Sequence, residues 1–204
     1  MRTNRIAVAA ALAAAPFLAA ASATAEAVVG QPAPAFEGVD TNGSTHTLAS
    51  FAGKYVVLEW FNPDCPFVRK HYDSGTMQKL QKTYTGKGVI WLTVASSAPG
   101  KQGHLDAESG KAVLERTKAS PTALILDSDG VIGKAYGAKT TPHMFILDPH
   151  GRVIYAGGID DKPSTDQADL AGAKAYVAEA LNEALAGRSV TTPTSQPYGC
   201  SVKY

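Results

Sequence analysis

The stretch Tyr55-Val56-Val57-Leu58-Glu59-Trp60-Phe61-Asn62-Pro63-Asp64-Cys65-Pro66-Phe67 decides the fold. Residues 55–61 form a nearly continuous apolar run, which is typical of a central strand buried on both faces. Pro66 has a φ suited to the first turn of a helix and no N–H to leave unpaired, so we expect a helix from Pro66 to about Tyr84. Cys65 therefore stands at the junction between a buried strand and a helix.

A sulfur at this junction meets the unpaired N–H groups and the positive dipole end of the helix, which favour the thiolate. Arg69 and Lys70 lie about one turn further on and add to this effect, whereas Asp64 opposes it. A thiolate of low pKa is both nucleophile and leaving group in disulfide exchange. Cys65 is therefore the candidate redox-active thiol, and a buried, inert cysteine is the alternative.

The remaining pattern alternates strands with helices. Strands are expected at 89–95 and 122–126, and a hairpin at 144–147 and 152–156. The expected helices cover 106–117, 131–136 and 166–186. Asn42-Gly43 marks a hairpin near the N-terminus. This order predicts an α/β, three-layer fold: a mixed central sheet with helices on both faces and an N-terminal β-hairpin extension.

Residues 1–25 have the layout of a cleaved secretory signal peptide. Arg2 and Arg5 precede an Ala-rich apolar stretch, and small residues offer cleavage sites after Ala25 or Ala27. A membrane anchor is the alternative, but the stretch is short for a span and contains Pro16. We expect a periplasmic or secreted protein with one domain at 28–187, a C-terminal tail at 188–204 and no membrane span in the mature chain.

Charge and cysteine content narrow the function classes. The 204-residue chain has a formal net charge of +1, and loss of Arg2 and Arg5 leaves 17 basic against 18 acidic residues. This balance argues against a nucleic-acid partner. Cys65 and Cys200 are too few for a disulfide scaffold, but an even pair in an exported chain is expected to be bridged part of the time.

Two further positions have chemical potential. Glu59 is the only charged residue of its strand, and a buried carboxylate usually has a raised pKa and can transfer protons. The alternative is a Glu at a strand end that reaches solvent or pairs with a Lys. Thr141-Pro142 immediately precedes a strand, where a cis proline is expected to leave the backbone of Thr141 open for pairing.

Taken together, these motifs resemble the thioredoxin-like superfamily over about 29–186. The resemblance is to its redoxin branch, which includes alkyl hydroperoxide reductase/thiol-specific antioxidant proteins and TlpA-like exported oxidoreductases. Glu59 stands six residues before Cys65, where thioredoxins place a buried Asp that serves the second cysteine. The other matching segments are Gly30-Gln31-Pro32-Ala33-Pro34-Ala35-Phe36, Tyr136-Gly137-Ala138, Thr141-Pro142, Ile146-Leu147-Asp148 and Gly151.

The chain departs from the related families at the site itself. Thioredoxins have Cys-x-x-Cys, whereas Val68 occupies the second cysteine's position here. Peroxiredoxins place Thr or Ser three residues before the peroxidatic cysteine and Pro seven residues before it. This chain has Asn62 and Leu58 there. Asn62 is the polar group that could replace the Thr hydroxyl, which helps to position peroxide in that family.

Cys200 is the candidate for the missing partner thiol. It lies in a Gly-Cys-Ser motif near the end of the tail, with Tyr198, Val202 and Tyr204 available to dock on an apolar surface. We expect a Cys65–Cys200 disulfide in the oxidised form, within one chain or swapped between two. A free terminal thiol or an unrelated intermolecular link is the alternative.

The leading hypothesis is an exported thiol–disulfide oxidoreductase without cofactor or resident metal. Cys65 is its nucleophile, Cys200 resolves the mixed disulfide, Glu59 relays the proton, and Thr141 and Pro142 hold the backbone of the partner. The expected partners are protein or small-molecule thiols and disulfides, or peroxides, and the sequence leaves the oligomeric state open.

Two alternatives stay open. One is a peroxiredoxin-like antioxidant peroxidase, in which Cys65 becomes a sulfenic acid and Cys200 condenses with it. The other is a non-enzymatic module, either a domain with a structural disulfide or a copper carrier. In the carrier, His71 or His143 would join the two thiolates, since this donor set suits Cu(I).

Overall fold

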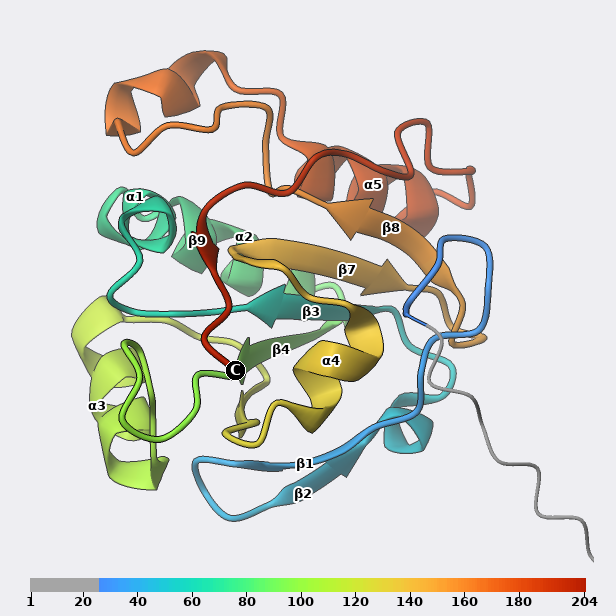
Figure 1. Cartoon of the computed structure of the whole chain (residues 1–204). Coiled ribbons are helices and arrows are strands. Elements are labelled where there is room, and N and C mark those ends of the chain that lie inside the picture. Colours follow the sequence, from blue (N-terminus) through green and yellow to red (C-terminus); the bar gives the residue numbers. More distant parts are fainter. Residues whose placement is uncertain (1–25) are drawn as a thin grey trace, which may run out of the picture.

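The fold centres on a seven-stranded mixed sheet (Figure 1). The computed structural model describes residues 26–204, so the predicted signal peptide lies outside the described residues. The strand order is β2-β1-β5-β4-β3-β7-β8, in which β3, β4 and β5 are parallel and the other pairs are antiparallel. The strands are β1 (Glu37–Asp40), β2 (Thr45–Thr47), β3 (Val56–Trp60), β4 (Ile90–Ala95), β5 (Ala123–Leu126), β7 (His143–Leu147) and β8 (Val153–Gly157).

Helices cover both faces of this sheet, so the predicted α/β architecture is confirmed. The larger core lies between the sheet and the side chains of α1, α2, α3 and α5, and the other core lies between the sheet and α4. Every residue of β3 is buried, as its apolar sequence predicts. The helices are α1 (Pro66–Asp73), α2 (Thr76–Thr85), α3 (Ala107–Thr117), α4 (Val131–Tyr136) and α5 (Tyr176–Leu185), with 3-10 turns η1 (Leu48–Phe51) and η2 (Gln167–Gly172).

Two long helices predicted from the sequence are each divided in the structure. The helix expected from Pro66 to about Tyr84 breaks at Gly75, whose φ of 77° is left-handed and starts α2 in a new direction. The helix expected at 166–186 is η2 followed by α5. Ala173, with φ −77° and ψ 136°, has an extended backbone that separates the two. Apolar spacing alone does not reveal the break at Gly75, because side chains of both α1 and α2 face the core, whereas no residue of η2 is buried.

The C-terminal tail is packed along the domain (Figure 1, red). Thr194 pairs with Ala156 beside β8, and the short strand β9 (Cys200–Ser201) then pairs antiparallel with β6 (Thr140–Thr141). The chain ends next to α4, where the Tyr204 hydroxyl donates to the carbonyl of Ala138 at 2.8 Å. The tail thus crosses from α5 to α4 over the strand-to-helix junction that contains Cys65.

Candidate active site

Cys65 is the N-cap of α1, which confirms the predicted junction of strand and helix. Pro66 follows in the first helical turn, and the Cys65 side chain makes no capping bond to the helix backbone. The turn before it is built by Asn62, whose carbonyl accepts from the Cys65 N–H at 3.1 Å and whose Oδ1 accepts from the Asp64 N–H at 2.8 Å. The sulfur is therefore fixed at the N-terminal end of α1, and Cys65 is 0% exposed.

The predicted cis proline also lies at this site. The Thr141–Pro142 peptide bond is cis, and the Cys65 thiol donates a hydrogen bond to the carbonyl of Thr141 at 3.0 Å. Residues 76 positions apart in the chain are thus in direct contact.

The backbone of Thr141 was expected to be open for pairing, but in the structure it is already paired. In the register of β6 with β9, Thr141 lies opposite Cys200 and Thr140 lies opposite Ser201. The N–H of Val202 continues this pairing with a 3.1 Å hydrogen bond to the carbonyl of Lys139. The tail of the same chain therefore occupies the edge that was expected to receive a partner.

This pairing brings the two cysteines together. Both are free thiols in the described structure, and both residues meet at Thr141, which accepts from the Cys65 thiol and is paired with Cys200. Burial by itself would raise the pKa of Cys65, but the polar side chains of Cys200 and Thr141 beside the sulfur outweigh it, so the pKa of Cys65 is lowered. Burial, the bond to Cys65 and the charge of Cys65 raise the pKa of Cys200 to about 11. Cys65 is therefore the sulfur that ionises first.

Glu59 is buried in the centre of the sheet, neither solvent-exposed nor paired with a Lys. Its Oε1 accepts from the Tyr72 hydroxyl at 2.6 Å, and its Oε2 accepts from Trp91 Nε1 at 2.8 Å. Thr93 and Gln81 donate to Oε2 at 3.2 and 3.3 Å. Burial raises the pKa of Glu59 in spite of these bonds, while no sulfur is among its partners in the described structure. The carboxyl group thus joins β3 and β4 to α1 and α2.

Asn62 is not free to replace the Thr hydroxyl of peroxiredoxins. Its Oδ1 accepts from Asp64, and its Nδ2 donates to the carbonyl of Gln102 at 3.3 Å. Gly103 packs so closely that a Cβ there would lie 2.1 Å from Asn62 Oδ1. The amide therefore holds the turn before Cys65 against the loop that contains Gln102 and Gly103.

The two histidines considered for copper face other groups. Nε2 of His71 lies 3.2 Å from the Tyr198 hydroxyl, and Nδ1 of His143 accepts from the Lys139 N–H at 3.3 Å. The ring of His143 packs against Phe145 at a centroid distance of 4.5 Å. Within residues 26–204, no group of three or more His, Cys, Asp or Glu side chains is arranged to hold a metal ion.

A cavity of about 880 Å³ lies beside the active-site turn. Pro63, Asp64 and Val68 line it near the turn, and Arg116 and Lys118 line it at the end of α3. Neither cysteine contributes to its wall, so it is separate from the paired thiols.

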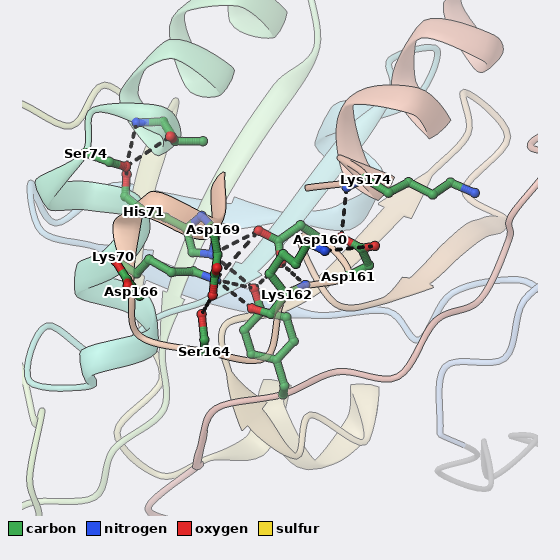
Figure 2. A network of polar contacts seen from close by, with 12 residues as sticks. Lys70, His71, Ser74, Asp160, Asp161, Lys162, Ser164, Asp166, Asp169 and Lys174 are labelled. Atoms are coloured by element: carbon green, nitrogen blue, oxygen red, sulfur yellow. Dashed lines mark hydrogen bonds and ion pairs between the residues drawn. The ribbon is translucent and has the colours of Figure 1, made fainter. Parts of the chain in front are cut away.

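The buried polar cluster of Lys70, His71, Asp160 and Tyr198 was not predicted from the sequence. Figure 2 shows Lys70 and His71 directed from α1 toward Asp160, which follows β8. The available signal was two adjacent basic residues between the apolar positions Val68 and Tyr72 of an amphipathic helix. Their partners lie far along the chain, so the pattern of α1 alone does not identify them.

Comparisons with known proteins identify the family and the fold of the chain. The model of the Redoxin family matches residues 28–174, so the chain belongs to the Redoxin family. Family and fold together identify it as an oxidoreductase of the thioredoxin-like superfamily. No curated protein matches the chain. In the described residues, no helix has the length and apolarity needed to cross a membrane.

Three solved structures illustrate the likeness. A hypothetical protein from Sinorhizobium meliloti 1021 is 25% identical, with 88% of this chain and 96% of that chain covered and a TM-score of 0.73. An uncharacterized conserved protein from Geobacillus kaustophilus is 25% identical, with 87% and 92% covered and a TM-score of 0.76. The thioredoxin domain of a thiol-disulfide oxidoreductase from Bacteroides vulgatus is 23% identical, with 71% and 96% covered and a TM-score of 0.52.

Proposed function

We propose that the protein is an exported thiol–disulfide oxidoreductase in which Cys65 is the nucleophile and Cys200 is the resolving cysteine. The observation that carries this proposal is the shared contact with Thr141, whose carbonyl accepts from the Cys65 thiol at 3.0 Å while its backbone is paired with Cys200 on β9. The lowered pKa of Cys65 and the raised pKa of Cys200 support the division of roles, because the more acidic thiol supplies the attacking thiolate.

The reaction proceeds in two exchanges. The Cys65 thiolate attacks one sulfur of a substrate disulfide, forms a mixed disulfide and releases the first substrate thiolate. Cys200 then attacks the Cys65 sulfur, which forms the Cys65–Cys200 disulfide and releases the second substrate thiolate. The substrate gains two electrons, the two cysteines lose them, and the protons of the two thiols pass to the leaving thiolates.

Glu59 is the proposed proton acceptor for Cys200, as its raised pKa and central position suggest. Its hydrogen-bond partner Tyr72 is on α1, the helix that Cys65 begins. A proton path between the carboxyl group and the cysteines would therefore run through the Tyr72 hydroxyl. Thr141 and the cis Pro142 are proposed to hold a partner's backbone in the complex. Because β9 occupies this edge, a polypeptide partner has to displace the tail strand.

A thiol peroxidase is the second candidate function, and the complete burial of Cys65 is the observation that favours it. A sulfur that is 0% exposed beneath the tail is easier to reach for a peroxide than for a protein disulfide. Oxidation of the Cys65 thiolate by hydrogen peroxide would give a sulfenic acid and hydroxide, and condensation with Cys200 would give the same disulfide and water. The engaged amide of Asn62 speaks against a peroxide pocket of the peroxiredoxin type.

One comparison separates the two activities. Reduced wild type, Cys65→Ser and Cys200→Ser are mixed either with hydrogen peroxide or with a model protein disulfide, and the rates of consumption are followed. We expect fast, Cys65-dependent exchange with the disulfide and slow consumption of peroxide. Fast, Cys65-dependent consumption of peroxide alone would contradict the proposal and assign the peroxidase activity.

Two direct measurements test the remaining parts. Thiol labelling and peptide mapping by mass spectrometry of freshly isolated, unreduced protein should find Cys65 linked to Cys200, and full labelling of both thiols would contradict the link. For export, the N-terminus of the protein purified from its host should begin at Glu26 or Val28. A mature chain that retains Arg2 and Arg5 would contradict cleavage.

A further inference from the structure

The buried polar cluster lies on the face of α1 that meets the tail. Lys70 is 2% exposed, His71 is 1% exposed and Asp160 is 4% exposed, although all three side chains are titratable. Burial of such groups without partners is costly, and residues of similar size without charge would pack there at no such cost. We therefore expect a function of these three side chains other than filling the core.

The hydroxyl of Tyr198 is the common partner of this cluster. It donates to Oδ1 of Asp160, accepts from Nζ of Lys70 at 3.3 Å and lies 3.2 Å from Nε2 of His71. Nζ of Lys70 also donates to the carbonyl of Lys162 at 2.6 Å, and it lies 3.8 Å from Oδ2 of Asp160 (Figure 2). One tail hydroxyl thus bonds to α1 and to the loop after β8 at the same time.

The ring of Tyr198 also has defined contacts with α1. It packs edge-on against Phe67 at a centroid distance of 5.9 Å, and Nζ of Lys70 lies 5.1 Å from the ring centroid. Phe67 is the second residue of the helix that Cys65 begins. The same short helix therefore fixes both the nucleophilic sulfur and the anchor of the tail.

Only Gly199 separates this anchor from Cys200. Its φ is 128°, and a Cβ at this position would lie 2.0 Å from the carbonyl oxygen of Thr141. The backbone therefore turns from Tyr198 directly onto the edge of β6, where Cys200 is opposite Thr141. With one residue between them, the position of the Tyr198 side chain sets the position of the Cys200 sulfur.

We propose that Tyr198 is a positioning residue, whose hydroxyl, clamped by Asp160 and Lys70, holds the tail so that Cys200 lies against Cys65. This inference rests on the proposed function, because it assigns the anchor to the second exchange, in which Cys200 attacks the mixed disulfide on Cys65. Orientation of two reacting groups can account for a large part of a rate. Loss of the anchor slows the second exchange relative to the first one, because the first exchange does not use Cys200.

The aromatic disulfide DTNB separates the two exchanges, since each releases one coloured thiolate. Reduced wild type is expected to release a first equivalent by attack of Cys65 and a second one when Cys200 resolves the mixed disulfide. In Tyr198→Phe, which keeps the ring but loses the hydroxyl, the second release should slow by at least about tenfold. Asp160→Asn keeps the size of the side chain but removes the negative charge that pairs with Lys70 in the clamp, so it should also slow the second release.

Tyr55→Phe is the matched control. Its hydroxyl also donates one hydrogen bond, to the main-chain carbonyl of Ala184 at 2.9 Å, but Tyr55 lies immediately before β3 and far from the tail in the chain. This variant should keep both rates, so that a general loss of stability is separated from a loss of position. A second readout is thiolate absorbance against pH: Tyr198→Phe should raise the pKa of Cys65 as the bond from Cys200 weakens, and Tyr55→Phe should not.

Unchanged second release in both Tyr198→Phe and Asp160→Asn would overturn the positioning role. Equal slowing in Tyr55→Phe would overturn it too, since the effect would then reflect stability. If wild type itself releases only the first equivalent, with the mixed disulfide on Cys65 seen by intact mass, the resolving role of Cys200 fails instead. The two failures are therefore distinguishable.

Discussion

At the scale of single residues, the site depends on two thiols of different acidity. Cys65 gains hydrogen bonds from its surroundings, whereas Cys200 faces the sulfur that ionises first. The position of Cys65 could be predicted because strand, Pro66 and helix adjoin it in the sequence. The position of Cys200 could not, because a strand of two residues has no periodicity from which its register can be read.

Replacement of Cys200 tests the origin of this acidity. Cys200→Ala removes the first of the hydrogen bonds that lower the pKa of Cys65, so this pKa should rise. Cys200→Ser keeps a donor at the same place and should show a smaller rise. Thiolate absorbance against pH measures both, and wild type should show a second step near pH 11 from Cys200 itself. Identical first steps in all three proteins would contradict the proposed bond.

His143 should make stability depend on pH. Burial, and then the charge of Lys139, lower its pKa to about 4 from 6.5. Between these values the unfolded chain binds a proton that the folded chain does not, so the stabilisation is present above pH 6.5 and is lost as the pH falls toward 4. From pH 7 to pH 5, His143 should cost about 2 kcal/mol of unfolding free energy.

Urea denaturation of wild type and His143→Gln at the two pH values measures this effect. The variant should lose less stability between pH 7 and pH 5 than wild type does. His150→Gln, in an exposed turn, serves as the control and should keep the wild-type dependence. Equal slopes for His143→Gln and wild type would show that His143 does not titrate as described.

Glu59→Gln tests the proton role of the buried carboxyl. An amide keeps the size of the side chain and can still accept from Trp91, but it cannot take up a proton. The second thiolate release from DTNB should slow by at least about tenfold at neutral pH. Its pH profile should also lose the ionisation that reflects the raised pKa of Glu59. Exposed Glu115→Gln should change neither, and an unaltered profile in Glu59→Gln would reduce Glu59 to a structural link.

At the scale of elements, the pairing of β6 with β9 is the structural core of the site. The cis proline that ends β6 was predictable from Thr141-Pro142 before an apolar strand, but the strand that fills its edge was not. The break at Gly75 had a local signal, since glycine readily adopts a left-handed φ. The apolar spacing on both sides nevertheless favoured one continuous helix.

Gly199→Ala should disturb this pairing selectively. A Cβ would meet the carbonyl oxygen of Thr141, so β9 should move away from β6 while the seven-stranded sheet is kept. Hydrogen exchange should become faster at the Val202 N–H, and formation of the Cys65–Cys200 disulfide should become slower. Gly187→Ala is the control, because Gly187 also has a positive φ but has open space around it. Equal effects of the two substitutions would indicate backbone strain rather than loss of the strand.

At the scale of the whole molecule, a Cys65–Cys200 link would close a loop around α1 to α5 and β4 to β8. Closing a loop of more than 100 residues restricts the unfolded chain, which by loop entropy stabilises the folded protein by about 5 kcal/mol. Guanidinium denaturation of wild type should therefore show a higher midpoint for the oxidised than for the reduced form. Cys200→Ser should be insensitive to the reductant, and a wild type that is equally insensitive would argue against the closed loop.

The strand β9 also competes with any polypeptide partner for the edge of β6 at the proposed redox site. A tethered segment is present at its own binding edge at a local concentration that reaches millimolar values for short tethers. A polypeptide that pairs with Thr141 has to exceed this local concentration, or bind more tightly than Cys200 and Ser201 do. Extended chains that bind this edge weakly therefore do not displace β9. The oxidoreductase thus selects partners by the strength of their backbone pairing, before their side chains contribute.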